Sequence, residues 1–522
     1  MSKADQEIRP TEASRAHCLV GWGLYALTAM ALLDSLPREA FGSDAGRFIL
    51  LIGVIASWRY SWQAVHLVRS LFYRHRRFPQ WRRRADQLGA ESRAPHVYVL
   101  VTSYRMAAEA NLAAYRALFL EAMAYGAPAT VVASVTDGGD EALLEQLFVS
   151  LYPPESLKLL LMQQAGTGKR DAMAAGLRAI SRRNPPPGSV LILMDGDTVV
   201  TPGTLARSIP FFRFMPDLGA LTVDNRTATT GSDWAKEWYA LRMAQRHIYM
   251  CSIGLSRRLL VLTGRFSIFR AELATDPDFI AALENDAIDH WRLGRVKFLT
   301  GDDKSTWFWL LKNRWAMLYL PDVHVMCMEE LPGSGFVKSS LKLMTRWFGN
   351  MLRNNGRAIA LGPRAMGFFT WWCLVDQRLS IWTALSGPAF AVLISLAGRP
   401  EAIPIYLLWI MLTRFCQALV IFLHRGRLSP YNPPLLFYTQ IVGSAVKVYM
   451  SFRIDRQSWT RQGVRVIQNR SVAATVNSAF TVYLTGLAVV AFLYFAAVIA
   501  QVLPLPGQDL IRANMLGSGF PQ

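Results

Sequence analysis

The chain has 522 residues and a formal net charge of +19; 52% of its residues are hydrophobic and 18% are charged. This length exceeds one ordinary core, so at least two domains are expected. The basic residues are grouped beside apolar stretches, which favours a membrane protein and argues against nucleic-acid binding. The five cysteines are far apart and odd in number, so no disulfide framework or zinc spacing is visible.

Two apolar segments near the N-terminus, at 18–33 and 48–68, predict a transmembrane hairpin over residues 1–70. Seven arginines and no acid lie between Arg69 and Arg84. Because positive charge is retained on the cytoplasmic side of a membrane, residues 71–95 are expected to form a basic cytosolic linker, with the N-terminus on the same side. No cleavable signal peptide is recognisable, so the first apolar segment is expected to remain as an anchor.

Residues 96–335 alternate short apolar stretches with helical ones, and none is long enough to span a bilayer. Strands are expected at 97–102, 129–136, 157–162 and 191–194, with helices such as 107–123 and 171–181 between them. This alternation is typical of a parallel sheet with crossover helices. The sequence therefore predicts a cytosolic α/β domain inserted between membrane segments.

Two acidic pairs follow predicted strands. Asp195 and Asp197 come at the carboxyl end of the strand 191–194, where α/β sheets bind ligands, and carboxylate oxygens suit Mg²⁺ or Mn²⁺ that bridges to phosphate. Asp302 and Asp303 follow a strand expected at 296–300 and could supply the general base that a metal-bound pair cannot. Either pair alone could equally be a surface turn, because Asp and Gly favour turns.

The second half of the chain returns to membrane patterning. Residues 336–370 are amphipathic and basic, with Lys338, Lys342, Arg346 and Arg353 among apolar side chains, which predicts interfacial helices. A transmembrane hairpin is expected at 371–425, with spans at 379–397 and 402–423. An interfacial helix at 435–452 is expected within the segment 426–471. A last span at 472–503 then leaves the tail 504–522 outside.

Two arginines, Arg59 and Arg414, fall inside predicted spans, where an unpaired guanidinium costs about 2.5 to 3.5 kcal/mol on insertion scales. They could line a water-filled path for an acidic polymer. They could equally pair with a carbonyl or carboxylate elsewhere in the helix bundle.

A series of short motifs resembles those of the processive, membrane-integrated family 2 glycosyltransferases, the group of cellulose, chitin and hyaluronan synthases. In chain order they are VTSYR, TDGG with Asp137, GTGKRDAMAAGL with Lys169 and Arg170, DGD at 195–197, LTGRFSIFR near Thr263, GDD at 301–303, and RW at Arg346 and Trp347. A late SWTR, formed by Ser458, Trp459, Thr460 and Arg461, looks like the gating-loop motif of that group. The resemblance runs from about residue 97 to 470. It implies a cytosolic GT-A domain, the nucleotide-diphospho-sugar transferase fold, inserted in a multi-span α-helical membrane domain.

Within that group, the chain looks most like the mannuronan synthases of bacterial alginate production. The segments that carry this likeness are LTGDDKSTWFWLLK, MLYLPDVHVMCMEE, TRWFGNMLRNNGRAIALGP and FRIDRQSWTRQ. The chain departs from the cellulose-synthase pattern twice: Leu343 stands where QxxRW has glutamine, and Gly301 begins what is usually TED. The first departure suggests a donor other than UDP-glucose, whereas the base is retained at Asp303.

The resemblance implies a role for each matched residue. Asp303 would be the base that takes the acceptor proton. Asp137, Lys169, Arg170, Asp195 and Arg346 would bind the nucleotide sugar, and Asp195 and Asp197 would hold Mg²⁺ or Mn²⁺. Trp347 and Asp302 would contact the acceptor sugar. The alternative for Lys169 and Arg170 is solvated charge at a helix N-terminus, because GTGK lacks the first glycine of a P-loop and has Gln163 there.

These observations predict a metal-dependent inverting polymerase in the bacterial inner membrane, with its catalytic domain in the cytosol. It would join mannuronate from GDP-mannuronate into β-1,4-linked polymannuronate and translocate the growing polysaccharide among membrane lipids. The resemblance also implies a PilZ-domain, cyclic-di-GMP-binding co-polymerase and periplasmic export proteins as partners. The alternatives are a synthase that uses a UDP-sugar, a non-processive transferase that acts on a lipid-linked sugar, and a membrane protein whose cytosolic domain only binds.

Overall fold

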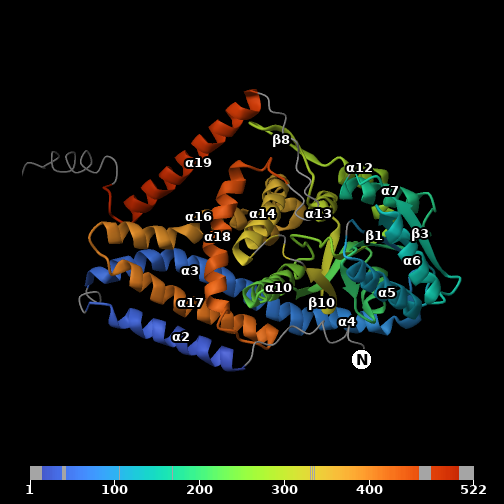
Figure 1. The fold of residues 1–522 in the computed structure, drawn as a ribbon, viewed down its shortest axis with the longest axis horizontal. Coiled ribbons are helices and arrows are strands. Elements are labelled where there is room, and N and C mark those ends of the chain that lie inside the picture. The colour runs from blue at the N-terminus through green and yellow to red at the C-terminus, as the bar shows by residue number, and fades with distance from the viewer. Residues whose placement is uncertain are drawn as a thin grey trace, which may run out of the picture. The chain divides into compact units, whose positions relative to one another are not determined.

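The computed structural model describes residues 15–37, 43–104, 106–166, 168–329, 331, 333, 335–457 and 472–504 (Figure 1). The chain forms two compact units, the first built around Ala64–Gln377 and the second around Arg378–Arg453. The first unit also includes residues 454–457, and the second includes residues 15–63 and 472–504 of the described chain. The Ser458, Trp459, Thr460 and Arg461 segment, expected to be a gating loop, lies outside the described residues.

The described part of the first unit contains an eight-stranded sheet in the order β3-β2-β1-β4-β7-β6-β10-β5. Its strands are β1 (Val97–Thr102), β2 (Ala129–Val135), β3 (Leu157–Gln163), β4 (Val190–Asp195), β5 (Thr198–Val200), β6 (Leu218–Thr229), β7 (Phe266–Arg270) and β10 (Ala316–Glu329). The four strands β1 to β4 confirm the expected ones and pair in parallel. The apolar runs of β1, β2 and β4 are continuous because both faces are covered, whereas the edge strand β3 is only half-buried; Val97, Val99 and Ile192 are fully buried.

Beyond β4 the sheet is mixed, so the expectation of a parallel sheet holds for only part of it. Strand β7 runs antiparallel to both β4 and β6, and β10 is parallel to β6 but antiparallel to β5. An alternation of strands and helices predicts crossovers. Here, however, the connection from β6 to β7 leaves and returns at the same edge, which requires an antiparallel neighbour.

Helices surround this sheet: α4 (Phe78–Gln87), α5 (Ala108–Tyr125), α6 (Gly138–Ser150), α7 (Lys169–Ser181), α8 (Thr204–Ser208), α9 (Phe211–Phe214), α10 (Asp233–Gly254), α11 (Ala271–Ala274), α12 (Pro277–Glu284), α13 (Asp302–Lys312), α14 (Phe336–Ala360) and α15 (Pro363–Met366). Helix α7 packs on β1 and β2, and α6 on β2 and β3. Figure 1 shows α5, α6 and α7 beside β1 and β3. Helices α5 and α7 match the two helices expected from the sequence.

The segment expected to be a basic linker is largely helical. A five-residue π-helix, Tyr73–Arg77, leads directly into α4, and a short 3₁₀-helix, Gly89–Ser92, follows. Tyr73, Phe78 and Trp81 are buried, and the Tyr73 hydroxyl donates to the Tyr319 carbonyl at 2.6 Å. The guanidinium of Arg82 makes two 2.8 Å hydrogen bonds to Asp322. Alternating aromatic and arginine residues therefore dock this segment on β10 instead of leaving it solvated.

The strand expected at 296–300 is only partly present. Strands β8 (Ala287–His290) and β9 (Gly294–Lys297) form a separate antiparallel hairpin, and residues 298–300 lie outside any strand. The backbone N–H of Leu299 bonds to the side-chain oxygen of Gln457 at 2.9 Å, and that of Phe298 bonds to the Asp286 carbonyl at 2.8 Å. These partners replace a strand ladder and set the path of the chain into α13.

The second unit is helical. It contains α2 (Arg15–Asp34), most of α16 (Phe368–Leu396), α17 (Ala402–Arg425), α18 (Asn432–Phe452), α19 (Val472–Ile499) and part of α3 (Ser43–Phe72). Within the described ranges, three helices are long and apolar enough to cross a membrane: Phe368–Leu396, Ala402–Arg425 and Thr475–Ile499. The apolar part of α2, Cys18–Asp34, is shorter. The two N-terminal spans and the interfacial position of α18 stay predictions.

Candidate active site

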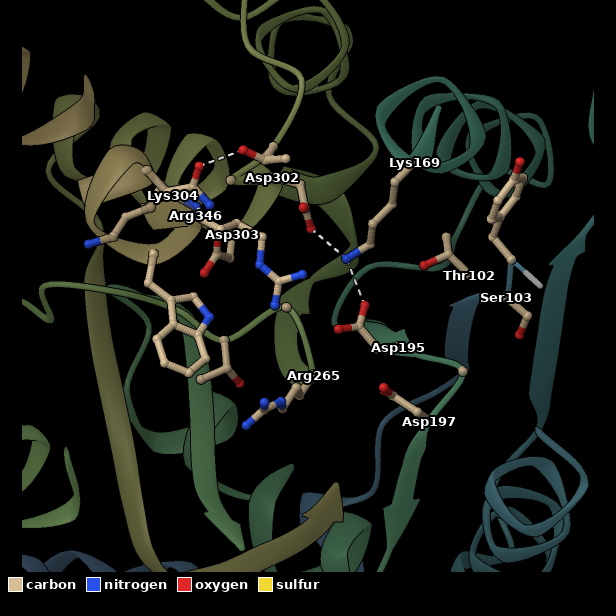
Figure 2. Close-up of a pocket in the computed structure, with 18 of the residues that line it drawn as sticks. Thr102, Ser103, Lys169, Asp195, Asp197, Arg265, Asp302, Asp303, Lys304 and Arg346 are labelled. Atoms are coloured by element: carbon tan, nitrogen blue, oxygen red, sulfur yellow. Dashed lines mark hydrogen bonds and ion pairs between the residues drawn. The ribbon is translucent and has the colours of Figure 1, made fainter. Parts of the chain in front are cut away.

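Two acidic segments that are far apart in the sequence meet at one cavity in the first unit. Asp195 ends β4 and Asp197 follows one glycine later, whereas Asp302 and Asp303 form the first turn of α13. All four line a cavity of 440 Å³, and Figure 2 shows their side chains around it. The parallel register aligns Thr102 of β1 with Asp195, so the carboxyl ends of these strands form the cavity wall.

The glycine between Asp195 and Asp197 is required by the close approach of β1. The N–H of Gly196 bonds to the Thr102 carbonyl at 3.1 Å, and a Cβ at this position would lie 2.2 Å from the Ser103 hydroxyl oxygen. Any larger residue would push the two chains apart. The DGD segment is therefore a close-packed strand end with two carboxylates at the cavity, not a solvated surface turn.

Lys169, the first residue of α7, connects the two acidic segments. Its ammonium donates to Asp195 Oδ1 at 2.6 Å and to Asp302 Oδ2 at 2.8 Å, as the dashed lines in Figure 2 mark. Burial alone would raise the pKa of the Asp302 carboxyl, but the Lys169 ammonium holds that pKa below its ordinary value. Burial raises the pKa of Asp195, and Lys169 offsets this only in part. Lys169 keeps its charge because the two carboxylates raise its pKa.

Asp303 lies in a different electrostatic environment from Asp302. Burial, together with the neighbouring Asp302 charge, raises the pKa of the Asp303 carboxyl to about 6. Burial also lowers the pKa of the adjacent Lys304 to about 8, although Asp303 opposes this shift. A carboxylate with a pKa near 6 is mostly ionised at pH 7 and still basic enough to accept a proton.

The turn before Asp302 is held by α14. Gly301 has φ of 84°, which favours glycine, and a Cβ there would lie 3.0 Å from Asn350 Cγ. The Thr300 hydroxyl donates to Asn350 Oδ1 at 2.6 Å, and Arg353 donates to Thr300 Oγ1 at 3.2 Å. Arg353 is thus buried inside the unit. Of the basic side chains expected at a membrane surface, Lys338 and Lys342 are exposed, whereas Arg346 lines the cavity.

Arg170 is turned away from the cavity. Its guanidinium donates to the carbonyls of Leu283 and Thr300, at 2.6 and 3.1 Å, and to the Ser305 hydroxyl at 3.0 Å. It therefore fastens α7 to the segment that carries Asp302 and Asp303. The structure does not bring Arg170 to the position expected for a donor-binding cation.

Asp137 is also absent from the cavity lining. It caps the N-terminus of α6, where its carboxylate accepts the Gly139 N–H at 2.7 Å, and it is exposed. Its neighbours Ser134 and Thr136 do line the cavity. Asp137 therefore lies beside this cavity wall, at the end of β2.

The RW pair of α14 also lines the cavity. Arg346, Trp347 and the atypical Leu343 all contribute to the lining. The Trp347 ring stacks on Trp238, with centroids 5.7 Å apart, and the Arg242 guanidinium lies 4.5 Å from the Trp347 ring centroid. Trp347 is thus held in an aromatic cluster at the cavity.

Sequence reasoning missed several cavity residues, above all the arginines Arg242, Arg246 and Arg265. Arg265 forms an ion pair with Glu329, and it lies in the LTGRFSIFR segment, so that motif could have indicated it. Arg242 and Arg246 are one helical turn apart on α10 and belong to no recognised motif. The signal that the sequence carries for them is their four-residue spacing, which places two arginines on one face of a helix.

The donor set of the cavity fits a divalent cation held jointly with a phosphate ligand. No group of three or more His, Cys, Asp or Glu side chains in the described ranges is arranged to hold a metal ion. Asp195 and Asp197 nevertheless place two carboxylates at the cavity. Mg²⁺ commonly takes one or two protein carboxylates and completes its octahedron with phosphate oxygens and water, so two are sufficient.

Comparisons with known proteins agree with this geometry. Residues 94–350 match the family model described as "Glycosyltransferase like family 2". The "Glycosyltransferase alg8" of Pseudomonas syringae pv. tomato is 43% identical over 446 residues, which is 85% of this chain and 90% of that protein. The protein of the same description from Azotobacter vinelandii is 42% identical over 454 residues, or 87% and 92% of the two chains.

Similarity to solved structures is low. The mannosyltransferase PcManGT of Pyrobaculum calidifontis, solved with GDP-Man and Mn²⁺, aligns over 74% of this chain and 97% of its own, with 17% identity and a TM-score of 0.40. S. aureus TarS 1–349 aligns over 72% and 97%, with 13% identity and a TM-score of 0.30.

Proposed function

This chain belongs to the family 2 glycosyltransferases, in the group of the alg8 glycosyltransferases, and we propose that it polymerises mannuronate from GDP-mannuronate into β-1,4-linked polymannuronate. It is an alginate-type glycosyltransferase with a GT-A domain and a helical membrane part. The observation that carries the catalytic proposal is the cavity where Asp303, with its raised pKa, lies beside the Asp195–Lys169–Asp302 cluster.

The reaction is a single displacement. The Asp303 carboxylate accepts the proton of the acceptor hydroxyl, and that oxygen attacks the anomeric carbon of the donor. The bond from this carbon to the phosphate oxygen breaks, and the diphosphate leaves with the electron pair. One inversion converts an α-linked donor into a β-linked product without a covalent intermediate. Lys169 and Arg346 stabilise the negative charge that develops on the diphosphate, and Trp347 packs against the acceptor sugar.

A divalent cation, Mg²⁺ or Mn²⁺, would be held by Asp195 and Asp197. When bound, it would neutralise charge on the diphosphate. The Lys169 ammonium on Asp195 Oδ1 already brings one cation to this side of the cavity. In this proposal Arg170 does not touch the donor but positions the Asp302–Asp303 turn. Asp137 binds the base or ribose of the nucleotide beside Ser134 and Thr136.

The membrane part is assigned to translocation. We propose that the protein lies in the bacterial inner membrane with its catalytic domain in the cytosol, and that the polymer leaves through the helical unit. The three apolar helices that could span a bilayer support a membrane location. A PilZ-domain co-polymerase that binds cyclic-di-GMP and periplasmic export proteins complete the proposed assembly.

The decisive experiment is incorporation of labelled sugar into polymer by membranes that contain the full chain. GDP-mannuronate, UDP-glucose and UDP-glucuronate are compared, with Mg²⁺ or with EDTA, and with the partner subunits co-expressed in one arm. We expect polymer from GDP-mannuronate alone, its loss with EDTA, and its loss in Asp303→Asn with donor binding retained. Polymer from a UDP-sugar would overturn the donor assignment, and release of single-sugar products would overturn processivity. Full activity of Asp303→Asn would overturn the mechanism.

A further inference from the structure

Two arginines on α10, Arg242 and Arg246, line the active-site cavity with buried guanidinium nitrogens that make no hydrogen bond to the described residues. The Nη1 and Nη2 atoms of Arg246 and the Nε atom of Arg242 are buried, and none of them has a hydrogen-bond partner among the residues that the structure describes. A buried guanidinium is normally paired, because desolvation of its charge is otherwise uncompensated. These nitrogens can therefore donate hydrogen bonds to an anionic ligand in the cavity.

The carboxylates near these arginines are already engaged. Asp224, whose charge reaches Arg246, accepts the Tyr319 hydroxyl at 2.8 Å and pairs with His247 at 3.3 Å. Glu329 is paired with Arg265, which contacts the same cavity.

The acids nearer the reaction centre are also engaged. Asp195 and Asp302 share the Lys169 ammonium. In the described part of the chain, the hydrogen bonds of these four acids thus go to groups other than the α10 pair, and the buried guanidinium nitrogens of that pair can donate to an incoming anion.

The position of Arg242 indicates which part of the substrates this charge would meet. Its guanidinium lies 4.5 Å from the Trp347 ring centroid and 5.1 Å from that of Trp238, on the aromatic cluster assigned to the acceptor. The diphosphate is instead assigned to Lys169 and the Asp195–Asp197 segment. Arg242 is thus beside the sugars rather than the phosphates, and Arg246 lies one helical turn further along α10.

We propose that Arg242 and Arg246 bind the carboxylate of a uronate sugar in the active site and so select acidic over neutral sugars. This inference rests on the proposed function, because it requires a uronate substrate. The carboxylate can come from the donor sugar or from the terminal sugar of the polymer. A guanidinium matches either one through two parallel N–H···O hydrogen bonds.

The test uses the full chain purified in detergent, with two binding series. The donor series compares GDP, GDP-mannose and GDP-mannuronate. The acceptor series compares a mannuronate oligosaccharide with a neutral mannose oligosaccharide of the same linkage and length. The variant is Arg246→Met, which keeps the length and apolar volume of the side chain. The exposed Arg213 of α9, changed to Met as well, is the matched control.

We expect Arg246→Met to lose about tenfold or more in affinity for the carboxylated ligand of one series, as expected for a charge-assisted hydrogen bond. Affinity for GDP, GDP-mannose and the neutral oligosaccharide should change less than about twofold. The melting temperature should change little, because the variant removes buried guanidinium nitrogens that make no hydrogen bond in the described structure. Arg242→Gln, tested in the same way, is the second variant should Arg246→Met fold poorly. The series in which the effect appears identifies the carboxylate as that of donor or polymer.

Three outcomes would overturn the inference. If both variants keep the wild-type preference for carboxylated ligands, the recognition lies elsewhere and only this inference fails. If they weaken GDP as much as GDP-mannuronate, the arginines bind the diphosphate. If the wild-type protein itself does not prefer carboxylated ligands in either series, the uronate assignment of the proposed function fails first.

Discussion

Asp302 and Asp303 are neighbours in the sequence, yet their surroundings separate them chemically. Asp302 accepts the Lys169 ammonium at 2.8 Å and has a lowered pKa, so it stays ionised as part of the ion cluster. Asp303 has the pKa raised by burial to about 6. Two carboxyl groups whose pKa values are pushed apart commonly have distinct roles. We therefore assign Asp302 to holding the Lys169 ammonium and Asp303 to accepting the proton.

The pH dependence of polymer synthesis follows from Asp303. A general base works only when ionised, so the rate should fall as the pH drops through about 6. At pH 5 roughly a tenth of the carboxyl groups would be ionised, so kcat/KM should be reduced about tenfold from its plateau. Initial rates between pH 5 and 8 at saturating metal check this. A rate that is flat from pH 5 to 7 would contradict the role of Asp303.

Removal of the Lys169 ammonium should destabilise the catalytic unit. In Lys169→Met, the Asp195 and Asp302 carboxylates would lose their shared cation; because these pairs are part-buried, the cost should be below the roughly 3 to 5 kcal/mol of a fully buried pair. Thermal unfolding of the full chain in detergent should show a lower melting temperature, and adding Asp302→Asn should restore part of it. Lys158→Met, at an exposed lysine of β3, is the control and should change little. A double variant less stable than Lys169→Met would refute this electrostatic account.

At the scale of elements, α14 and the chain around Gln457 hold the catalytic turn from two sides. Arg353 of α14 donates to the Ile454 carbonyl at 2.9 Å and to Thr300 Oγ1 at 3.2 Å. Gln457 accepts the Leu299 N–H at 2.9 Å and donates to the Lys297 carbonyl at 2.8 Å. Gln457 directly precedes Ser458, the start of the proposed gating loop. Gln457 and Asp302 are about 150 residues apart in the sequence, yet Gln457 contacts the backbone of Leu299, three residues before Asp302.

Gln457→Ala should therefore act as a positioning defect. Loss of these backbone contacts would loosen residues 297–300 and displace Asp303. A displacement near 1 Å can lower turnover roughly 10- to 100-fold. We expect kcat to fall while the KM for the donor changes less than about twofold, because the Asp195–Lys169 pair is untouched. The exposed Gln146 of α6, changed to Ala, is the matched control. A change in KM with normal kcat would instead place Gln457 at the donor.

The elements that the sequence predicted well are those whose signal is local. Strands β1 to β4 are short, mostly apolar runs, interrupted by a charge only at Lys158 in β3, with turn residues near their ends, so their bounds and the acidic end of β4 could be predicted. The antiparallel β7 could not, because strand direction depends on where the preceding connection returns. The inward direction of Arg170 and Arg353 was also missed, because composition cannot distinguish a solvated arginine from one that bonds to buried carbonyls. The α10 pair was missed because it belongs to no motif.

At the scale of the whole molecule, the helical unit contains a polar network around Arg414, of which the sequence predicted only the arginine itself. Arg414 of α17 is 7% exposed and donates to the side-chain oxygens of Gln417 and of Gln440 on α18. Gln417 in turn donates to Gln63 of α3 at 2.6 Å, and Gln440 donates to the Ala384 carbonyl of α16 at 3.0 Å. Pairing with carbonyls, one of the two expectations for Arg414, is thus present. The partners are neutral amides, so the positive charge is not cancelled.

Two roles for this network make different predictions. If the charge attracts a passing polyuronate, Arg414→Leu should leave nucleotide release with short acceptors intact but shorten the polymer, and Arg414→Lys should preserve its length. If the network only ties the helices together, Arg414→Lys should fail as well, and Gln440→Leu should have the same effect as Arg414→Leu. Polymer length by size-exclusion chromatography, measured beside nucleotide release, distinguishes the two. Because the amide partners leave the charge available, we expect the first pattern; normal polymer length in Arg414→Leu would exclude it.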